Sequence, residues 1–281
     1  MSCINKNENW GVFRENGKMG KLRKKQRPIN TLTYNQILLA DLKKEASEIF
    51  RLSDDLRSFI NTIRLSATTA AIGVVLGTLI SHALVNTRNK YTHNSVMALA
   101  DVATNFGGAP LAFAFIVTLG STGVITLILK NLFNISLYPD FRIYSITGLT
   151  LAYLYFQIPL MILLIQPSIL GLKSDWKEAA STLGESNWQY WKRIALPILA
   201  PSLIGGFLLL FAHSFGAYAT AWTLTGPDIN LVTIQIAALI RGEVQLEPGI
   251  ADAMAIISLL IMMLCVAGYQ WASTRAAKWR T

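Results

Sequence analysis

The chain has 281 residues, of which 52% are hydrophobic and 15% are charged, and its formal net charge is +9. Charged residues make up about a quarter of an average soluble domain, so this composition indicates a membrane protein. The positive charge does not indicate nucleic-acid binding, because 12 of the 25 basic residues precede residue 59 and the others lie beside apolar segments. The two cysteines, Cys3 and Cys265, are too far apart for a disulfide framework, and no metal-ligand spacing is present.

Residues 1–58 form a polar, basic segment without an apolar run long enough for a membrane span or a signal-peptide core. Between residues 31 and 57, leucine and isoleucine are interspersed with charged residues. This pattern predicts either an amphipathic helix lying at the membrane interface or a solvated, partly ordered tail.

Residues 59–272 contain five segments long and apolar enough to cross about 30 Å of hydrocarbon, which takes about 20 helical residues. Because lipid offers no hydrogen-bond partners to the backbone, spanning segments of this kind must be helices. The predicted fold class is therefore an all-α polytopic membrane protein. The five spans are placed near residues 65–85, 95–119, 143–165, 198–224 and 250–269.

Polar residues inside three of these spans are candidates for a solute pathway, because polar groups are costly in hydrocarbon and usually face the interior of a helix bundle. The second span is also interrupted by Gly107, Gly108 and Pro110, and a broken helix frees backbone groups that a cavity can use. The alternative role is hydrogen bonding between helices, and for Asp101 an interfacial position. The pathway candidates are Asp101, Asn105, Gln157, His213 and Ser214.

A polar stretch at residues 175–197 separates the third and fourth spans. Asp175 and Glu178 stand in a D-x-x-E arrangement that predicts a capped helix start. Gly184 permits a turn that other residues resist, and Pro197 suits the first turn of the next long helix. The stretch therefore predicts a short, rigid, polar knob between two apolar helices, a shape suited to docking. Trp188, Tyr190 and Trp191 are expected to anchor it at the membrane interface.

The distribution of lysine and arginine predicts which side of the membrane each loop faces. The segments after the first, third and fifth spans hold nine basic residues, whereas the opposite loops hold Lys130, Arg142 and Arg241. The positive-inside rule therefore places the 175–197 stretch and the basic tail at residues 273–281 in the cytoplasm. Residues 234–240, ahead of Arg241, resemble a short surface helix on the outer side, which either meets a partner protein or closes an outer gate.

The stretch with Glu178-Ala179-Ala180, then Gly184, then Ile194-Ala195-Leu196-Pro197 resembles the cytoplasmic EAA loop of permeases in ATP-binding-cassette (ABC) importers. Further runs that resemble this family are residues 61–66, 105–115 and 157–160, so the resemblance covers about residues 59–272. The glycine and proline cluster of the second span is similar to the branch that includes permeases for spermidine and putrescine, ferric iron and aminoethylphosphonate.

The resemblance implies a type I importer core made of two permease subunits, identical or different. Two cytoplasmic ATPase subunits would drive it, and an extracytoplasmic solute-binding protein would supply the solute, a polyamine or another small polar molecule. No G-x-x-x-x-G-K-[ST] phosphate loop occurs, so ATP and magnesium are expected on the partner ATPase and no cofactor on this chain. Glu178 would orient the knob and pair with a basic residue of the ATPase. Ala179, Ala180 and Leu183 would fill a groove of that partner, and Ile194, Leu196 and Pro197 complete the motif.

Permeases of this family commonly have six spans, and the orientation given above would leave the basic residues 18–27 outside the membrane. Three explanations stay open: a true five-span member, a chain whose first span has been lost or replaced, and an N-terminal arm that stays outside despite its charge. The second explanation is the preferred one.

Two other classes of function compete with an importer subunit. An ion-coupled secondary transporter needs carboxylates deep in its spans and usually an internal repeat, but only Asp101 is available and no repeat is evident. A membrane-embedded enzyme needs a catalytic constellation such as H-E-x-x-H or G-x-S-x-G, and neither motif occurs. A non-enzymatic transport subunit in the cytoplasmic membrane is therefore the leading expectation.

Overall fold

The structure is a computed structural model that describes residues 10–15, 18–23, 31–87, 89–134, 138, 141–242 and 248–277. The chain divides into two units, Met1–Leu52 and Ser53–Thr281, which are described separately. In the first unit, strands β1 (Trp10–Glu15) and β2 (Lys18–Arg23) pair antiparallel, with Trp10 opposite Arg23. The all-α expectation did not include this hairpin. Its signal in the sequence is Asn16-Gly17, a pair typical of two-residue hairpin connections.

Helix α1 (Thr31–Val85) contains both the amphipathic stretch and the first predicted span. Residues 31–57 are therefore helical, whereas an amphipathic helix at the membrane interface stays a prediction. From Asp54 onward α1 is long and apolar enough to cross a membrane.

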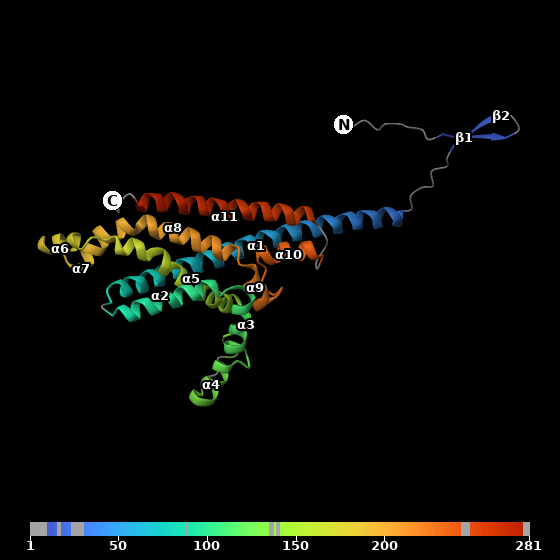
Figure 1. The fold of residues 1–281 in the computed structure, drawn as a ribbon. Helices are drawn as coiled ribbons and strands as arrows, with labels where there is room; N and C mark the ends of the chain where they lie inside the picture. The colour runs from blue at the N-terminus through green and yellow to red at the C-terminus, as the bar shows by residue number, and fades with distance from the viewer. Residues whose placement is uncertain are drawn as a thin grey trace. The chain divides into compact units, whose positions relative to one another are not determined.

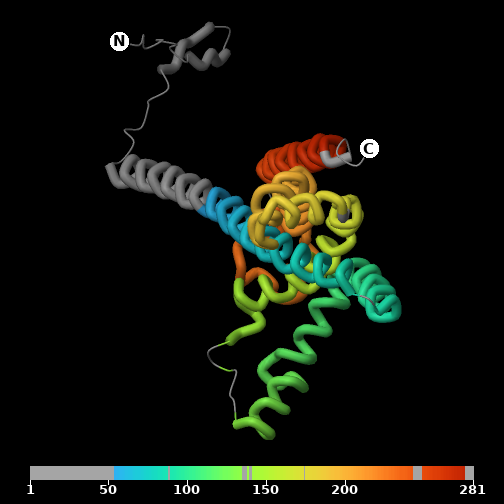
Figure 2. Tube along the Cα trace, turned by 90° about the vertical axis from the view of Figure 1, so that its left-hand side faces the viewer, coloured from blue at the N-terminus to red at the C-terminus, as the bar shows by residue number. Residues whose placement is uncertain are grey.

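The second unit continues with helices only, within the residues that the structure describes. They are α2 (Lys90–Asn105), α3 (Gly108–Leu119), α4 (Val124–Phe133), α5 (Ile146–Leu170), α6 (Ser174–Thr182), α7 (Asn187–Tyr190), the π-helix η1 (Trp191–Ala195), α8 (Leu196–Phe215), α9 (Tyr218–Thr225), α10 (Val232–Arg241) and α11 (Pro248–Ala277). In Figures 1 and 2, α8 lies beside α11 and also contacts α5, which packs against α2.

The described residues contain five candidate spans, as predicted, but two of their boundaries differ from the prediction. The second predicted span, 95–119, is broken where α2 ends at Asn105, and the apolar stretch of spanning length is Gly108–Phe133. The fourth predicted span, 198–224, is broken after Phe215, so α9 is a separate helix. In both places glycine interrupts the helix: Gly108 has φ of +73°, and Gly216 ends α8.

The core of the second unit forms where α1, α5 and α8 meet at small residues. A Cβ atom at Gly73 would lie 3.0 Å from Leu210 of α8 and 3.2 Å from Gln157 of α5. One turn further along α1, a Cβ at Gly77 would lie 2.6 Å from Met161 Cβ. Two glycines four residues apart let helix backbones approach closely in a membrane, where association depends on packing. This Gly73-x-x-x-Gly77 contact holds α1 against α5.

Candidate functional site

The polar stretch at residues 175–197 folds as two short helices packed against each other. The predicted cap at Asp175 is wrong: α6 begins one residue earlier, Lys173 is the N-cap residue without a side-chain cap bond, and Asp175 lies in the first turn. An acidic residue in a first turn still complements the helix dipole. The capping box of this stretch lies instead at α7, where Ser186 accepts from the Gln189 N–H and the Gln189 side chain accepts from the Ser186 N–H.

The turn at Gly184 has the geometry that the sequence predicts for a glycine. Its φ is +78°, in the left-handed region. The Glu185 N–H donates to the Ala180 carbonyl at 3.0 Å, and the Gly184 N–H donates to the Ser181 carbonyl at 3.0 Å. These two bonds are the Schellman pattern that satisfies carbonyls at the end of a helix. The turn therefore sets the angle at which the chain leaves α6.

Burial divides the residues of this stretch into an inner and an outer set. Ala180 is 4% exposed and packs with Tyr190 and Ala195, so its burial does not fit the expectation that it fills a groove of a partner. Ala179 and Glu178 are exposed, and Leu183 is 83% exposed. Leu183 is therefore a large apolar side chain that this chain leaves in solvent, on a surface available for docking.

Pro197 lies in the first turn of α8, as expected. No loop precedes it, however, because α7, η1 and α8 form one continuous helical segment, Asn187–Phe215. The residues before Pro197 form the π-helix η1, and the Leu196 N–H donates to the Trp191 carbonyl, five residues back. Proline has no N–H, and its ring excludes a normal α-helical fit against the carbonyl four residues back, so a wider turn accommodates it. Arg193, on η1, forms an ion pair of 2.8 Å with Glu185, which lies in the turn between α6 and α7.

The remaining motif residues lie on two sides of this helix. Ile194 is half-buried and packs with the Ala180 cluster. Leu196 is exposed and lines a different, apolar groove with Trp188 and Trp191. Trp188 is exposed, as an interfacial anchor would be, whereas Tyr190 is buried inside the stretch. The expectation of an interfacial role therefore does not fit Tyr190.

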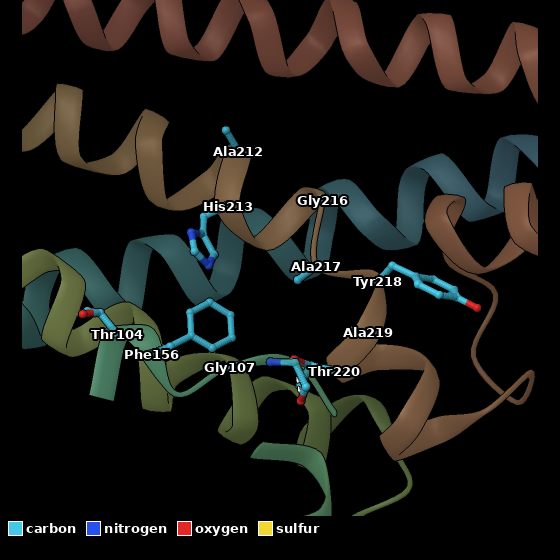
Figure 3. Close-up of a pocket in the computed structure, with 11 residues that line it drawn as sticks. Thr104, Gly107, Phe156, Ala212, His213, Gly216, Ala217, Tyr218, Ala219 and Thr220 are labelled. Carbon is cyan, nitrogen blue, oxygen red and sulfur yellow. Dashed lines mark hydrogen bonds between the residues drawn. The ribbon is translucent and has the colours of Figure 1, made fainter. Parts of the chain in front are cut away.

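A cavity of about 550 Å³ lies where the two interrupted spans meet. Figure 3 shows it bounded by the end of α8 with its following turn, by the start of α9, and by the break between α2 and α3. His213 projects from α8 toward Phe156 of α5, and the two ring centroids are 5.0 Å apart. The lining residues are Thr104, Gly107, Gly108, Phe156, Ala212, His213, Gly216, Ala217, Tyr218, Ala219 and Thr220.

Two hydrogen-bonded contacts hold the walls of this cavity together. The Gly108 N–H donates to Thr220 Oγ1 at 3.1 Å, and the same hydroxyl is 3.3 Å from the Gly108 carbonyl. The buried Tyr153 hydroxyl donates to the Ala217 carbonyl at 2.8 Å. The amino ends of α3 and α9 thus both lie at the cavity, and the amino end of a helix favours negative charge.

The structure brings only one of the five pathway candidates, His213, into the cavity lining. Asp101 and Asn105 are exposed on α2, where the Asn105 amide donates to the Asp101 carbonyl at 2.8 Å. Gln157 and Ser214 are buried. The Gln157 amide donates to Thr69 Oγ1 at 3.1 Å, and Thr69 Oγ1 is 3.2 Å from Ser214 Oγ. These three residues connect α1, α5 and α8, the arrangement expected of hydrogen bonds between helices.

Replacing Gln157 by leucine is expected to leave transport within about twofold of wild type and to change stability by less than about 1 kcal/mol. Hydrogen bonds between membrane helices average about 0.6 kcal/mol, and Thr69 and Ser214 keep each other as partners. Thermal unfolding of the purified complex and initial uptake rates check this expectation. A large loss of uptake in a stable Gln157→Leu variant would place this side chain in the pathway instead.

Several lining residues were absent from the sequence-based candidates, among them Thr104, Phe156, Tyr218 and Thr220. The available signal was the second helix break at Gly216-Ala217, which has the same kind of glycine interruption as Gly107-Gly108. Two interrupted spans facing each other predict a site between them. Phe156 carries no such signal, because a phenylalanine in an apolar helix resembles any packing residue.

The five candidate spans in the described part of the chain and the cavity at two broken helices define a polytopic membrane protein. Residues 73–278 match the family of binding-protein-dependent transport system inner membrane components, and the chain belongs to this family. It is therefore the permease subunit of an ABC importer in the inner membrane and not an enzyme. ATP hydrolysis takes place in a separate ATPase subunit, and the alternative of an ion-coupled secondary transporter is not favoured.

Known relatives and solved structures agree with this assignment. The chain is 26% identical over 204 residues to the probable sulfate transport system permease protein CysT of Helicosporidium sp. subsp. Simulium jonesii, covering 72% of each protein. It is 23% identical over 210 residues to the molybdenum transport system permease protein ModB of Mycobacterium tuberculosis, covering 74% of this chain and 75% of that protein. These names do not support the polyamine, iron and phosphonate branch suggested by the glycine and proline cluster.

Two solved transporters share the fold. A chain of the inward-facing methionine ABC transporter MetNI aligns with a TM-score of 0.58 and 14% identity, covering 78% of this chain and 94% of that chain. A chain of the bacterial alginate ABC transporter in complex with a periplasmic protein bound to alginate pentasaccharide aligns with a TM-score of 0.60 and 15% identity. That alignment covers 89% of this chain and 98% of the other chain. At these identities the likeness establishes the fold.

Proposed function

We propose that residues 175–197 couple this permease to its ATPase partners, and that the 550 Å³ cavity is part of a pathway for a small oxyanion. The coupling proposal is supported by the rigidity and exposure of the stretch. The Schellman turn and the Arg193–Glu185 ion pair fix its shape, whereas Glu178, Ala179 and Leu183 remain accessible. A rigid element that fits a groove transmits the closure of the ATPases to the helices, provided that the helices have two packings.

In this proposal the chain pairs with a second permease subunit, identical or different, and with two cytoplasmic ATPases and an extracytoplasmic solute-binding protein. The solved alginate transporter contains such a periplasmic protein. The coupling stretch and residues 273–281 face the cytoplasm, because the loops on that side hold the majority of the basic residues. The helices α9 and α10 then lie toward the outer side, where the solute-binding protein delivers its solute.

The observation that carries the substrate proposal is the chemistry of the cavity lining, which contains no acidic residue. A polyamine would need carboxylates to balance its charges in a water-poor site, and the only candidate, Asp101, is outside the lining. The lining instead offers the His213 imidazole and the amino ends of two helices, whereas the Thr104 hydroxyl already donates to the Asp101 carbonyl at 2.8 Å. Sulfate, in the name of one relative, is a tetrahedral oxyanion, and molybdenum dissolves as one in neutral water.

Cells that lack this importer and regain it from a plasmid test the substrate class. We expect radiolabelled sulfate or molybdate to enter only when this chain is present, and spermidine uptake to stay unchanged. His213→Ala is expected to lower oxyanion uptake about tenfold at low solute, the effect of losing one hydrogen bond to a charged group. The matched variant Asp101→Asn is expected to change oxyanion uptake less than about twofold, because Asp101 does not line the cavity. Spermidine uptake that depends on Asp101, with no oxyanion uptake, would contradict the proposal.

A further inference from the structure

Helix α9 is a short wall of the cavity that is separated from its neighbours along the chain. It has eight residues and lies between Gly216, which ends α8, and Gly226, whose φ is +57°. A Cβ atom at Gly226 would meet nothing within 4 Å, so this position requires glycine because of its backbone angle and not because a side chain would clash. Gly216 has a helical backbone angle, with φ of −87°, so the left-handed turn that separates α9 from the following chain lies at its carboxyl end alone.

Two of the contacts that position α9 are buried. Thr220, which is 2% exposed, bonds to Gly108 at the start of α3. At the α8–α9 turn, the Ala217 carbonyl accepts from the Tyr153 hydroxyl of α5. Both contacts are shielded from solvent and from any protein that docks on the outer surface.

A third contact is exposed and comes from α10. The Arg241 guanidinium carbon lies 5.0 Å from the centroid of the Trp222 ring and 5.8 Å from that of Tyr218. Arg241 also donates a hydrogen bond to the Tyr218 hydroxyl, and the rings of Tyr218 and Trp222 stack at 6.1 Å. In Figure 3 the Tyr218 ring is directed away from His213 and Phe156. Arg241 therefore contacts α9 on the side that faces away from the cavity interior.

Helix α10 is fixed independently of α9. Its Val232 and Leu239 side chains are fully buried and pack with Ala251 and Met254 of α11. The Val232 N–H donates to Thr62 Oγ1 of α1 at 2.9 Å. A guanidinium on this anchored helix ties α9 to α10, because planar stacking and directed hydrogen bonding act together in arginine.

We propose that Arg241 is a positioning residue that holds α9 in the closed position at the outer side of the cavity, and that its release opens the cavity outward. The inference rests on the proposed function for the orientation of the chain and for the cavity as a pathway. Ala221 and Leu224 of α9 also pack in the core, so of the polar contacts and the apolar packing only the Arg241 contact is accessible to a solute-binding protein that docks on the outer face. The two buried contacts stay intact and act as the pivot.

The test measures access to the cavity without any transported solute. A complete importer carrying Cys3→Ser, Cys265→Ala and Ala219→Cys places a single reactive thiol of this chain at an exposed lining residue. A membrane-impermeant maleimide is added to intact spheroplasts, and the rate of labelling is followed. Arg241→Gln is expected to accelerate labelling about tenfold, the combined effect of one hydrogen bond and the ring contacts. The purified complex is also expected to show raised ATPase activity in the absence of solute.

Three further variants distinguish the proposed positioning role of Arg241 from a general structural effect of the substitution. Tyr218→Phe deletes only the accepting oxygen and is expected to give a smaller acceleration, so it decides the question if Arg241→Gln does not assemble. Arg241→Lys keeps the charge without the planar fork and is expected to resemble Arg241→Gln. Lys130→Gln removes an exposed cation of α4 that is not part of the cavity lining, and the labelling rate should stay at the wild-type value.

Unchanged labelling in assembled Arg241→Gln and Tyr218→Phe importers would overturn the proposal, as would an equal acceleration in Lys130→Gln. Labelling that occurs only in inverted vesicles would overturn the proposed orientation, and with it the outward direction of opening. Because no solute is present in the assay, a wrong substrate class leaves these results unaffected.

Discussion

Replacing Gly184 by valine is expected to lower uptake at least about tenfold and to reduce co-purification of the ATPase partner. The residue holds φ of +78°, and an L-residue in the left-handed region costs roughly 1–2 kcal/mol, with β-branched residues among the worst. Helix α6 has only nine residues, so the turn that ends it controls where Glu178 and Leu183 are presented. A strained turn is expected to relax by shifting α6, and with it the exposed Glu178 and Leu183 side chains that are proposed to contact the ATPase.

The surroundings of Gly184 separate the effect of the backbone angle from the effect of side-chain contacts. A Cβ atom added there would meet nothing within 4 Å, so any effect comes from the backbone angle and not from a clash. Asparagine tolerates the left-handed region, and Gly184→Asn is therefore the matched control, expected to retain most co-purification and uptake. Equal behaviour of the valine and asparagine variants would show that the backbone angle has no part in coupling. Tagged-ATPase pull-down and initial uptake rates are the two measurements.

Replacing Gly77 by leucine is expected to lower the free energy of unfolding of the permease by about 3 kcal/mol. A loss of this size is enough to reduce the amount of folded complex in the membrane several-fold. A Cβ at this position already lies 2.6 Å from Met161 Cβ and 3.0 Å from the Ile158 carbonyl. Met161 is fully buried, and Gly206 of α8 faces its sulfur from the other side. Neither α5 nor its side chain is free to move aside, so α1 must separate from the bundle.

Thermal unfolding in detergent, followed by size-exclusion chromatography, measures this loss. Val75→Leu adds volume to the same helix at a side chain that is 57% exposed, and it is expected to leave the unfolding temperature unchanged. Combining Gly77→Leu with Met161→Ala is expected to restore little of the stability, because alanine keeps the Cβ at 2.6 Å and the Ile158 carbonyl stays at 3.0 Å. An unfolding temperature of Gly77→Leu equal to that of Val75→Leu would contradict the close approach of α1 and α5.

Sequence reasoning was most successful where a local property decides the structure. The number of spans follows from hydrophobic length, and the Gly184 turn follows from the conformational freedom of one residue. It was less successful at the ends of helices. Pro197 lies in the first turn of α8 as expected, but the cap expected at Asp175 is wrong, because α6 begins one residue before it. The π-helix before Pro197 was also not foreseen, and Ala195 at its end packs with Ala180 and Tyr190.

The pathway candidates also show that the positions of side chains in the bundle depend on tertiary packing. A polar side chain in a span is costly to expose to lipid. It avoids lipid either by hydrogen bonding to another helix or by lining a cavity, and the sequence does not distinguish these two positions. Gln157 and Ser214 take the first solution and His213 lines the cavity, although Ser214 and His213 are adjacent in the sequence. One residue along a helix turns a side chain by about 100°, so only the rotation of α8 in the bundle separates them.

By itself, the sequence determined that this protein spans a membrane as helices, that it presents a turned polar stretch between two spans, and that it resembles importer permeases. Hydrophobic length, glycine backbone freedom and motif spacing are properties of the chain alone. Only the tertiary structure decided that the two helix breaks face each other across one cavity and that Arg241 reaches α9 from α10. Those relations join residues far apart in the chain, and they exist because close packing of α1, α5, α8 and α11 fixes the distances between their helix ends.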